Sequence, residues 1–452
     1  MKWTMVVALA TVSAGLTSCS DEPDKYEVAG GTPTISYIRP VDVAAKDSLL
    51  EAASLKDQIC IVGNNLRSIK ELYFNDQKAV LNTSYMTDHT ILLTVPGNIP
   101  DKISDKIYMV TGGNDTIPYD FKVTIPAPSI GNMSNEWADP GEEVAINGSY
   151  FLDYDNYPLE IKVGDNYTLP RSAIKSIGRN QIVFTIPEDM PKDFIHVIDK
   201  FGDTKAPFKY KDDRGMIFDF DTPNAVTNEV LGNNGWHAQT ITKDESSLSG
   251  NYLQLGDGDA TMAADGGWND GKFSFEYWCG NWRDNETYAD HPRLCDVADF
   301  SDWNNKSIKF EMMIPESNPW MAGSMQVIFG SPAKISQGNA GAVDKYGMTL
   351  GGSNNTWFHA EDGMGRGVYT PWAATGKYDT KGKWVTVTIP LKDFDIDYDG
   401  NKANNLFKSV VDFSSLNIFI IRGAYNDKSV LPMGTDCQPI IKIDNIRVVP
   451  NI

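Results

Sequence analysis

The sequence is poor in the residues and motifs that most metal sites and catalytic sites require. Its 452 residues include 5 cysteines and 5 histidines, and it contains no CxxC pair, HExxH segment or GxSxG segment. The missing CxxC spacing excludes the common structural zinc sites. The other two absences exclude the zinc-peptidase and serine-hydrolase signatures. The sequence therefore predicts neither a metal cofactor nor a common hydrolase.

The cysteines beyond residue 19 carry no functional signal. Cys60 lies in the apolar run Gln58 to Val62 and is predicted to be a buried free thiol. The other three are widely scattered, so they allow at most one disulfide. They are Cys279, Cys295 and Cys437.

Positively charged residues are also fewer than negatively charged ones. The chain has 40 Lys and Arg residues against 60 Asp and Glu residues, which gives a formal net charge of -20 at pH 7. A surface this acidic repels a phosphate backbone, so nucleic acid is excluded as a partner. An uncharged polysaccharide is compatible with it.

Long apolar runs are absent except near the start of the chain. The run from Met5 to Leu16 is shorter than the about 20 apolar residues of a membrane-spanning helix and is typical of a secretory signal. Leu16-Thr17-Ser18-Cys19 resembles a bacterial lipobox, which implies that Cys19 is acylated. The acidic segment Ser20 to Asp24 resembles the signal that exports Bacteroidota lipoproteins to the outer face of the outer membrane. An ordinary signal peptide followed by a chance cysteine is the alternative.

Two similar segments follow one another between Gly30 and Lys211. Each opens with a proline, continues with an apolar strand that ends in glycine, and later has a strand closed by proline. The matching pairs are Pro33 to Ile35 with Pro128 to Ile130, Ile59 to Asn64 with Val144 to Ser149, and Ile91 to Pro96 with Ile182 to Pro187. Short runs broken by Gly, Pro and Asn predict two small antiparallel sandwiches. In order and pattern they resemble IPT/TIG immunoglobulin-like domains, which implies a stalk that lifts the third part off the membrane.

Tryptophan content changes after Gly215. Of the 11 tryptophans, 9 lie between Trp236 and Trp384, whereas the two repeats contain only Trp137. Strand patterns continue from Met216 to Val448 without a long helical period, so a larger, jelly-roll-like β-sandwich is expected. The predicted fold is therefore all-β, with two small immunoglobulin-like sandwiches and one large sandwich.

Aromatic residues in the loops of the third part are candidate platforms for sugar. A sugar ring presents flat patches of C–H groups that an exposed aromatic face can cover, and binding residues are common in loops. Trp384 lies in an alternating strand and is expected in the core, and Trp236 is left open between core and platform. The platform candidates are Trp320, Trp357, Tyr369 and Trp372, with Gln326 and Arg366 as candidates for bonding sugar hydroxyls. Core packing is the alternative for the aromatic residues, and a solvated loop position is the alternative for the polar ones.

Three segments of the third part carry a more specific resemblance. They are Asn318 to Phe329, Val368 to Trp372 and Trp384 to Leu391. Together with the lipobox and the tandem repeats, they resemble the B-type surface glycan-binding proteins of Sus-like polysaccharide utilisation loci. The resemblance implies an aromatic platform that holds a glucan chain, xyloglucan or mixed-linkage glucan, and a TonB-dependent transporter with a SusD-like lipoprotein as partners. The expected parts are a signal peptide (1–18), an acidic tether (19–32), two IPT/TIG-like domains (33–126 and 127–212) and a glycan-binding domain (213–452).

Acidic residues suggest two alternatives to simple binding. Asp219, Asp221 and Asp444 lie on the expected first and last strands of the third part, where they are candidates to share a structural Ca²⁺. Asp393 to Asp399 has alternating acids, the pattern that a sandwich glycosidase uses. The segment ends in Asp-Gly-Asn, so a turn or a solvated edge is favoured there. A surface glycoside hydrolase, and an adhesin that binds proteins through its repeats, remain the alternative functions.

Overall fold

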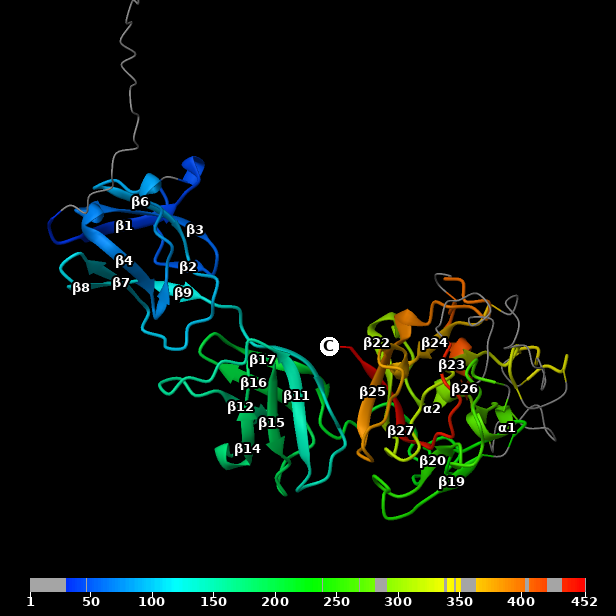
Figure 1. Cartoon of the computed structure of the whole chain (residues 1–452). Helices are drawn as coiled ribbons and strands as arrows, with labels where there is room; N and C mark the ends of the chain where they lie inside the picture. Colours follow the sequence, from blue (N-terminus) through cyan, green and yellow to red (C-terminus); the bar gives the residue numbers. More distant parts are fainter. Residues whose placement is uncertain are drawn as a thin grey trace, which may run out of the picture. The chain divides into compact units, whose positions relative to one another are not determined.

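The computed structural model describes residues 30–451 except 46, 238, 268, 281–290, 337–339, 345–346, 351–362, 403–405 and 421–432. Almost all regular structure in these residues is β, and the α-helices α1 (Asp270–Phe273) and α2 (Leu294–Val297) are short (Figure 1). The predicted all-β fold is confirmed. Among the described residues, no helix is long and apolar enough to span a membrane. Short 3-10 turns are η1 (Val43–Ala45), η2 (Leu66–Ser68), η3 (Thr83–Tyr85), η4 (Arg171–Ala173), η5 (Trp303–Asn305), η8 (Pro371–Ala374), η9 (Leu391–Asp393) and η10 (Val410–Phe413).

The chain divides into two compact units, one ending at Ile125 and one beginning at Pro126. The first unit is a single small sandwich. One sheet has the order β1 (Thr34–Pro40), β3 (Gln58–Asn64), β6 (Thr90–Thr94), and the other has the order β5 (Gln77–Lys78), β4 (Ile69–Phe74), β7 (Lys106–Thr111), β8 (Thr116–Asp120). A short parallel pair joins β2 (Ala52–Ser54) to β9 (Lys122–Thr124). Alternate residues of β4 and β7 are buried in the core between the sheets. Cys60 is buried and free, as predicted.

The second sandwich has the same plan and lies in the second unit. Its sheets are β10 (Ser129–Met133), β11 (Glu143–Ser149), β15 (Gln181–Thr185), β14 (Ile174–Ile177) and β13 (Tyr167–Thr168), β12 (Glu160–Val163), β16 (Phe194–Asp199), β17 (Gly202–Lys209). The immunoglobulin-like character of both repeats is confirmed by this arrangement.

The glycine shared by the two repeats has a physical cause. Gly63 in β3 and Gly148 in β11 lie against the bulged strand β1 or β10 of the same sheet. A Cβ atom on Gly63 would come within 1.9 Å of the Thr34 carbonyl oxygen, and one on Gly148 would come within 1.9 Å of the Ser129 carbonyl oxygen. Only glycine permits the two backbones to approach this closely.

The third part is a larger sandwich of two sheets. One sheet has the order β19 (Thr240–Thr242), β20 (Tyr252–Leu255), β27 (Ile441–Pro450), β22 (Lys306–Met313), β25 (Val385–Pro390), and β18 (Met216–Phe218) also pairs with β27. The second sheet has the order β21 (Ser274–Tyr277), β26 (Ser415–Ile420), β23 (Met325–Gly330), β24 (Arg366–Tyr369). The inward-facing residues of the two sheets form one hydrophobic core. The strands of the second sheet are mostly buried on both faces, so chain also packs on its outer face.

Buried charges join the second sandwich to the third. Glu136, in the loop after β10, is 2% exposed and reaches Lys309 on β22 at 2.6 Å and Arg447 on β27 at 3.1 Å. Arg447, which is 0% exposed, also pairs with Glu311 at 2.7 Å. Two acidic and two basic side chains thus neutralise one another away from water. Such a group is stable only while it is complete, because an unmatched buried charge is costly.

Thr386 on β25 closes this interface through its backbone and its hydroxyl. Its amide donates to the Ser134 carbonyl at 2.9 Å, and its hydroxyl accepts from the Glu136 amide at 2.7 Å. The same hydroxyl donates to Glu311 at 3.0 Å. Beside it, Trp137 packs against the buried cluster that contains Trp384. The second sandwich is therefore part of one packed body with the third.

Candidate functional site

Two of the expected platform residues lie in the core. Trp320 is 0% exposed and Trp372 is 2% exposed. Their indole N–H groups donate to the carbonyls of Ala322 at 2.6 Å and Gly323 at 2.7 Å, so both rings are fixed in the interior. The prediction that these turns expose tryptophan is wrong. The Pro and Gly composition around them shapes a turn that folds back over the core, which sequence composition alone does not distinguish from an exposed loop.

The other expected residues also differ from a surface platform. Tyr369 is half-buried against the core and lies 6.2 Å from Trp320 between ring centroids. Gln326 and Arg366 are 3% and 1% exposed, and the Arg366 Nε donates to Gln326 Oε1 at 3.2 Å. The alternative of a solvated loop position is wrong for both, since they are buried on β23 and β24. Trp357 and Cys19 lie outside the described residues.

The outer face of the second sheet carries a row of four buried side chains, three of which are polar. Strand register places Glu276 beside Asn417, Asn417 beside Ile328, and Ile328 beside Arg366. All four are at most 1% exposed. Trp278, just beyond β21, donates its indole N–H to Asn417 Oδ1 at 3.2 Å. The outer face is therefore a buried layer of polar and aromatic groups, and it forms a rigid base for whatever lies at its edge.

A loop along the edge of this sheet displays an exposed tryptophan. Asn234 pairs with β21 as a short extra bridge: its amide donates to the Glu276 carbonyl at 2.7 Å, and the Trp278 amide donates to the Asn234 carbonyl at 3.0 Å. Two residues later, Trp236 is 69% exposed. It is the most exposed tryptophan in the described part of the chain. This exposure excludes a core position for Trp236.

The buried side chain of Glu276 holds the loop that contains Trp236, here called the tryptophan loop. One carboxylate oxygen of Glu276 accepts from the backbone amides of both Trp236 and His237, the second at 3.0 Å. The Glu276 amide donates to Asn233 Oδ1 at 3.1 Å. Burial raises the pKa of the Glu276 carboxyl, and the His237 and Trp236 amides oppose that rise. These contacts fix the loop backbone, so that the indole is presented without the entropy cost of ordering a free loop.

Gly235 makes this arrangement possible. A Cβ atom at residue 235 would lie 2.3 Å from the Glu276 Cβ and 2.6 Å from Glu276 Oε2. The loop can approach β21 only because residue 235 has no side chain. The segment Asn233-Asn234-Gly235-Trp236 thus specifies a tight turn with an outward indole. The Asn-Asn-Gly turn is the signal for this loop in the sequence. The Glu276 carboxylate that holds the loop is 40 residues from Trp236 along the chain.

A hollow of about 320 Å³ lies next to the loop. It is lined by Val230, Leu231, Gly232, Asn233, Gln239, Ile241 and His291. Val230 and Ile241, which are 44% and 37% exposed, give the hollow part of its apolar lining. Gln239 and Asn233 add hydrogen-bonding groups. An exposed indole with a hollow of mixed apolar and amide lining near it is suited to binding a neutral ring with hydroxyl groups.

The acidic candidates make local hydrogen bonds within turns and between strands. No cluster of three or more potential metal ligands occurs among the described residues, so the calcium hypothesis gains no support. Asp219 instead accepts from the Asp221 and Thr222 amides, and Asp444 accepts from Ser249 Oγ at 3.0 Å. Asp397 accepts from the Asn401 amide at 2.9 Å, which confirms the predicted turn in the run of alternating acids. Cys279, Cys295 and Cys437 are free thiols.

Comparison with known proteins agrees with this architecture. Residues 210–450 match the family described as surface glycan-binding protein B xyloglucan binding domain. The crystal structure of surface glycan-binding protein PbSGBP-B from Prevotella bryantii is 66% identical, with a TM-score of 0.89, over 94% of this chain and 100% of that one. SGBP-B from a complex xyloglucan utilization locus in Bacteroides uniformis is 15% identical, with a TM-score of 0.42, over 93% of this chain and 100% of that one.

A curated relative matches over a shorter region. An IPT/TIG domain-containing protein of Bacteroides ovatus is 29% identical over 142 residues, which are 30% of this chain and 28% of that protein. The chain thus matches only 28% of the length of this relative. The family match, by contrast, covers more than half of the chain, and the Prevotella match covers nearly all of it. The chain therefore belongs to the surface glycan-binding protein B family and is a glycan-binding protein, not an enzyme.

Proposed function

We propose that this protein captures a neutral β-glucan, most directly xyloglucan, on a platform that includes the indole of Trp236. The observation that carries the proposal is the combination of 69% exposure of Trp236 with a loop backbone fixed by the buried Glu276. An aromatic face of this kind contributes about 1 kcal/mol to stacking on a flat partner. The name of the matching family, which specifies a xyloglucan binding domain, favours xyloglucan among the β-glucans.

Weak individual contacts are sufficient for this role. A polysaccharide repeats the same unit many times, and a protein displayed in many copies engages several units at once. Each site then needs only micromolar to millimolar affinity, about 4 to 8 kcal/mol. The proposal therefore requires a shallow platform rather than a deep pocket, which agrees with the exposed setting of Trp236.

The cellular setting belongs to the same proposal. We infer that Cys19 is acylated and holds the protein on the outer face of the outer membrane, with the repeats as spacers. The support is the lipobox-like segment Leu16 to Cys19 and the acidic residues after it. A TonB-dependent transporter with a SusD-like lipoprotein is the proposed recipient of the captured glycan. Replacement of Cys19 by Ala is expected to release the protein from the membrane fraction into the medium.

Affinity electrophoresis tests the platform. Native gels contain xyloglucan, barley β-glucan, laminarin or mannan, and reducing ends are measured in parallel. Trp236→Ala is expected to weaken retardation by xyloglucan about fivefold or more, since it removes an aromatic contact of about 1 kcal/mol. Its melting temperature should stay unchanged because the side chain is exposed.

Tyr85→Ala is the matched control, because Tyr85 is an aromatic residue that is 58% exposed in the first sandwich. It should retain full retardation. Unchanged retardation of Trp236→Ala would place the platform elsewhere on the third sandwich. Release of reducing ends would support the hydrolase, and absence of retardation by any of the glycans would support the adhesin.

A further inference from the structure

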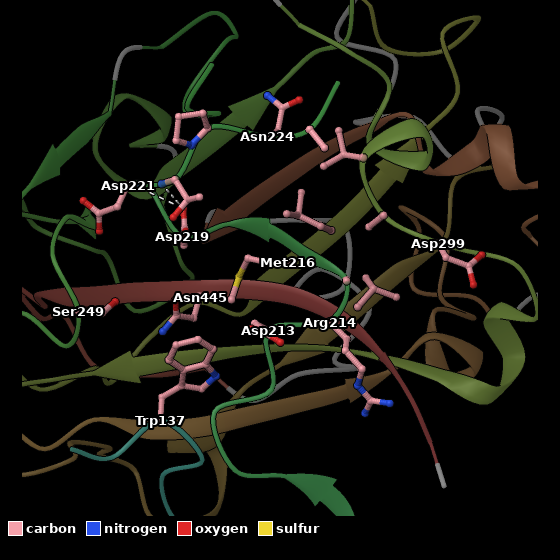
Figure 2. A pocket seen from close by; sticks show the side chains of 18 of the residues that line it. Trp137, Asp213, Arg214, Met216, Asp219, Asp221, Asn224, Ser249, Asp299 and Asn445 are labelled. Atoms are coloured by element: carbon pink, nitrogen blue, oxygen red, sulfur yellow. Dashed lines mark hydrogen bonds between the residues drawn. The ribbon is translucent and has the colours of Figure 1, made fainter. Parts of the chain in front are cut away.

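A second cleft lies where the second sandwich meets the third. Its volume is about 760 Å³, which falls within the range of small-molecule sites, about 300 to 1,000 Å³. Trp137 and Lys192 come from the second sandwich, Asp213 to Gly215 come from the connecting segment, and the remaining lining residues come from the third (Figure 2). Ligand sites are common at such junctions, because two domains together make a concave surface that neither makes alone.

The buried interface described above fixes the two walls of this cleft to each other. The lining residue Trp137 is adjacent in sequence to Glu136, which pairs with both Lys309 and Arg447. The Arg447 guanidinium lies 5.8 Å from the Trp137 ring centroid. The wall contributed by the second sandwich is therefore locked to the wall contributed by the third. A ligand would meet a preformed site and would not have to order it.

Charges along the cleft are largely matched by partners within the protein. Lys306 pairs with Asp299 at 2.8 Å, and Arg214 pairs with Asp212 at 2.7 Å. Asp221 accepts from the backbone and side-chain amides of Asn251. The lining contains three cationic side chains and four carboxylates, a formal charge of 3 − 4 = −1. This balance disfavours a strongly charged ligand and favours a neutral, polar one.

Trp137, Met216 and Asn445 form the apolar and amide part of the lining, and Figure 2 draws them in one region of the cleft. Asn445 is 1% exposed, and its Nδ2 has no acceptor within the described chain. The Trp137 Nε1 is likewise buried without an acceptor among these residues. Buried donors normally have an acceptor, so two such donors beside one cleft indicate an oxygen-rich occupant.

We propose that this cleft is a second binding site for a neutral saccharide, separate from the Trp236 platform. The Trp137 indole and the Met216 thioether supply the apolar wall for a sugar ring. Asp219 and Asp299 supply acceptors for its hydroxyls. The choice of saccharide as the ligand class rests on the function proposed above. A second site in the same rigid body would let one polysaccharide chain be held at two points, which slows its release.

Calorimetric titration of the full chain tests the second site. The probes are a xylogluco-oligosaccharide and a mixed-linkage heptasaccharide. Ala225→Trp places a large ring in the cleft from an exposed lining position, without removing an existing contact. Val226→Trp is the matched control, because Val226 is 49% exposed and does not line the cleft. Trp137→Phe keeps the aromatic wall and removes the unpartnered N–H group.

The native chain is expected to bind two equivalents of at least one probe. In Trp236→Ala, one equivalent should bind about fivefold more weakly than in the native chain. Ala225→Trp should remove the other equivalent, Val226→Trp should keep both, and Trp137→Phe should weaken the cleft equivalent at least threefold. Loss of all binding in Trp236→Ala alone would overturn the second site and leave the proposed function standing. Loss of all binding in Ala225→Trp alone, with Trp236→Ala unchanged, would keep the cleft and overturn the Trp236 platform. Equal stoichiometry in native chain and Ala225→Trp would also overturn the second site.

Discussion

The two immunoglobulin-like sandwiches share a fold but differ in the segment after their first strand. In the first sandwich, β1 leads through the short turn Val43–Ala45, and this sandwich is a compact unit of its own. In the second, β10 leads into Glu136 and Trp137, which are packed against the third sandwich. Glu136 and Trp137 thus link the second repeat to the third sandwich.

A second difference concerns the edge of one sheet. In the second sandwich, seven residues separate Ala173, the end of η4, from Gln181, the start of β15, and the first four of them form the edge strand β14. In the first sandwich, only four residues separate Tyr85, the end of η3, from Thr90, the start of β6, and they make a single bridge, Met86 to Ile91. Repeats therefore conserve the strand order of the core and vary the loops that decide what each sandwich contacts.

The largest expected effect is on the free energy of unfolding. It comes from a substitution that breaks the interface between the second and third sandwiches. Arg447→Met removes the cation that faces both Glu136 and Glu311 and leaves two buried carboxylates with only Lys309. We expect the free energy of unfolding of the second unit to fall by about 3 to 5 kcal/mol. Calorimetric melting of the full chain should show one lowered transition, with the transition of the first unit unchanged.

The comparable exposed pair in the first sandwich is the control. Lys78 and Glu71 lie 2.8 Å apart, with side chains that are 55% and 30% exposed. Lys78→Met should leave both transitions in place, because water screens an exposed pair. If Arg447→Met behaved like Lys78→Met, the buried charges would not hold the two sandwiches together.

A smaller effect tests what the two repeats have in common. Gly63→Ala and Gly148→Ala each add a Cβ atom whose ideal position lies only 1.9 Å from a carbonyl oxygen of the bulged strand. The bulged strand must shift in both cases, so we expect each substitution to cost about 1 to 3 kcal/mol. Gly63→Ala should lower only the transition of the first unit, and Gly148→Ala only that of the second.

Gly113→Ala is a control for these two variants, since the atoms nearest to its added Cβ lie 3.7 Å away and belong to side chains. It should leave both transitions within about 1 kcal/mol of the native values. If Gly63→Ala and Gly148→Ala had effects as small as this, the shared glycine would not be needed for the bulge.

Sequence reasoning predicted the fold well because the relevant signals are local. The strand periodicity and the repeated Gly after an apolar strand depend on neighbours within one hairpin or one sheet. Burial is a different property, because it depends on what folds over a segment from far along the chain. Trp320 lies in a turn composition but packs into the core, whereas Trp236 lies in a similar composition and is exposed. The partners of Glu136 are 173 and 311 residues away, and no local pattern could have indicated them.

The smallest expected effect is a change in the pH dependence of stability. It comes from Asp444 on the buried strand β27, beside this interface. Burial raises the pKa of Asp444 from 3.8 to about 8, and the carboxylates of Glu311 and Asp221 add to the rise. The folded state therefore binds a proton that the unfolded state releases above pH 4, so this group destabilises the fold as pH rises toward 8. Asp444→Asn keeps the size and removes the titration. The variant should be more stable than the native protein at pH 8, and the difference should shrink steadily toward pH 4.

Urea unfolding of the second unit at several pH values measures this difference directly. Subtracting the native curve from the variant curve removes the contributions of the titrating groups that do not interact with Asp444. A stability difference between Asp444→Asn and native protein that did not change with pH would mean that Asp444 is ionised in the fold. In that case the buried end of β27 would have to contain a compensating cation close to this carboxylate.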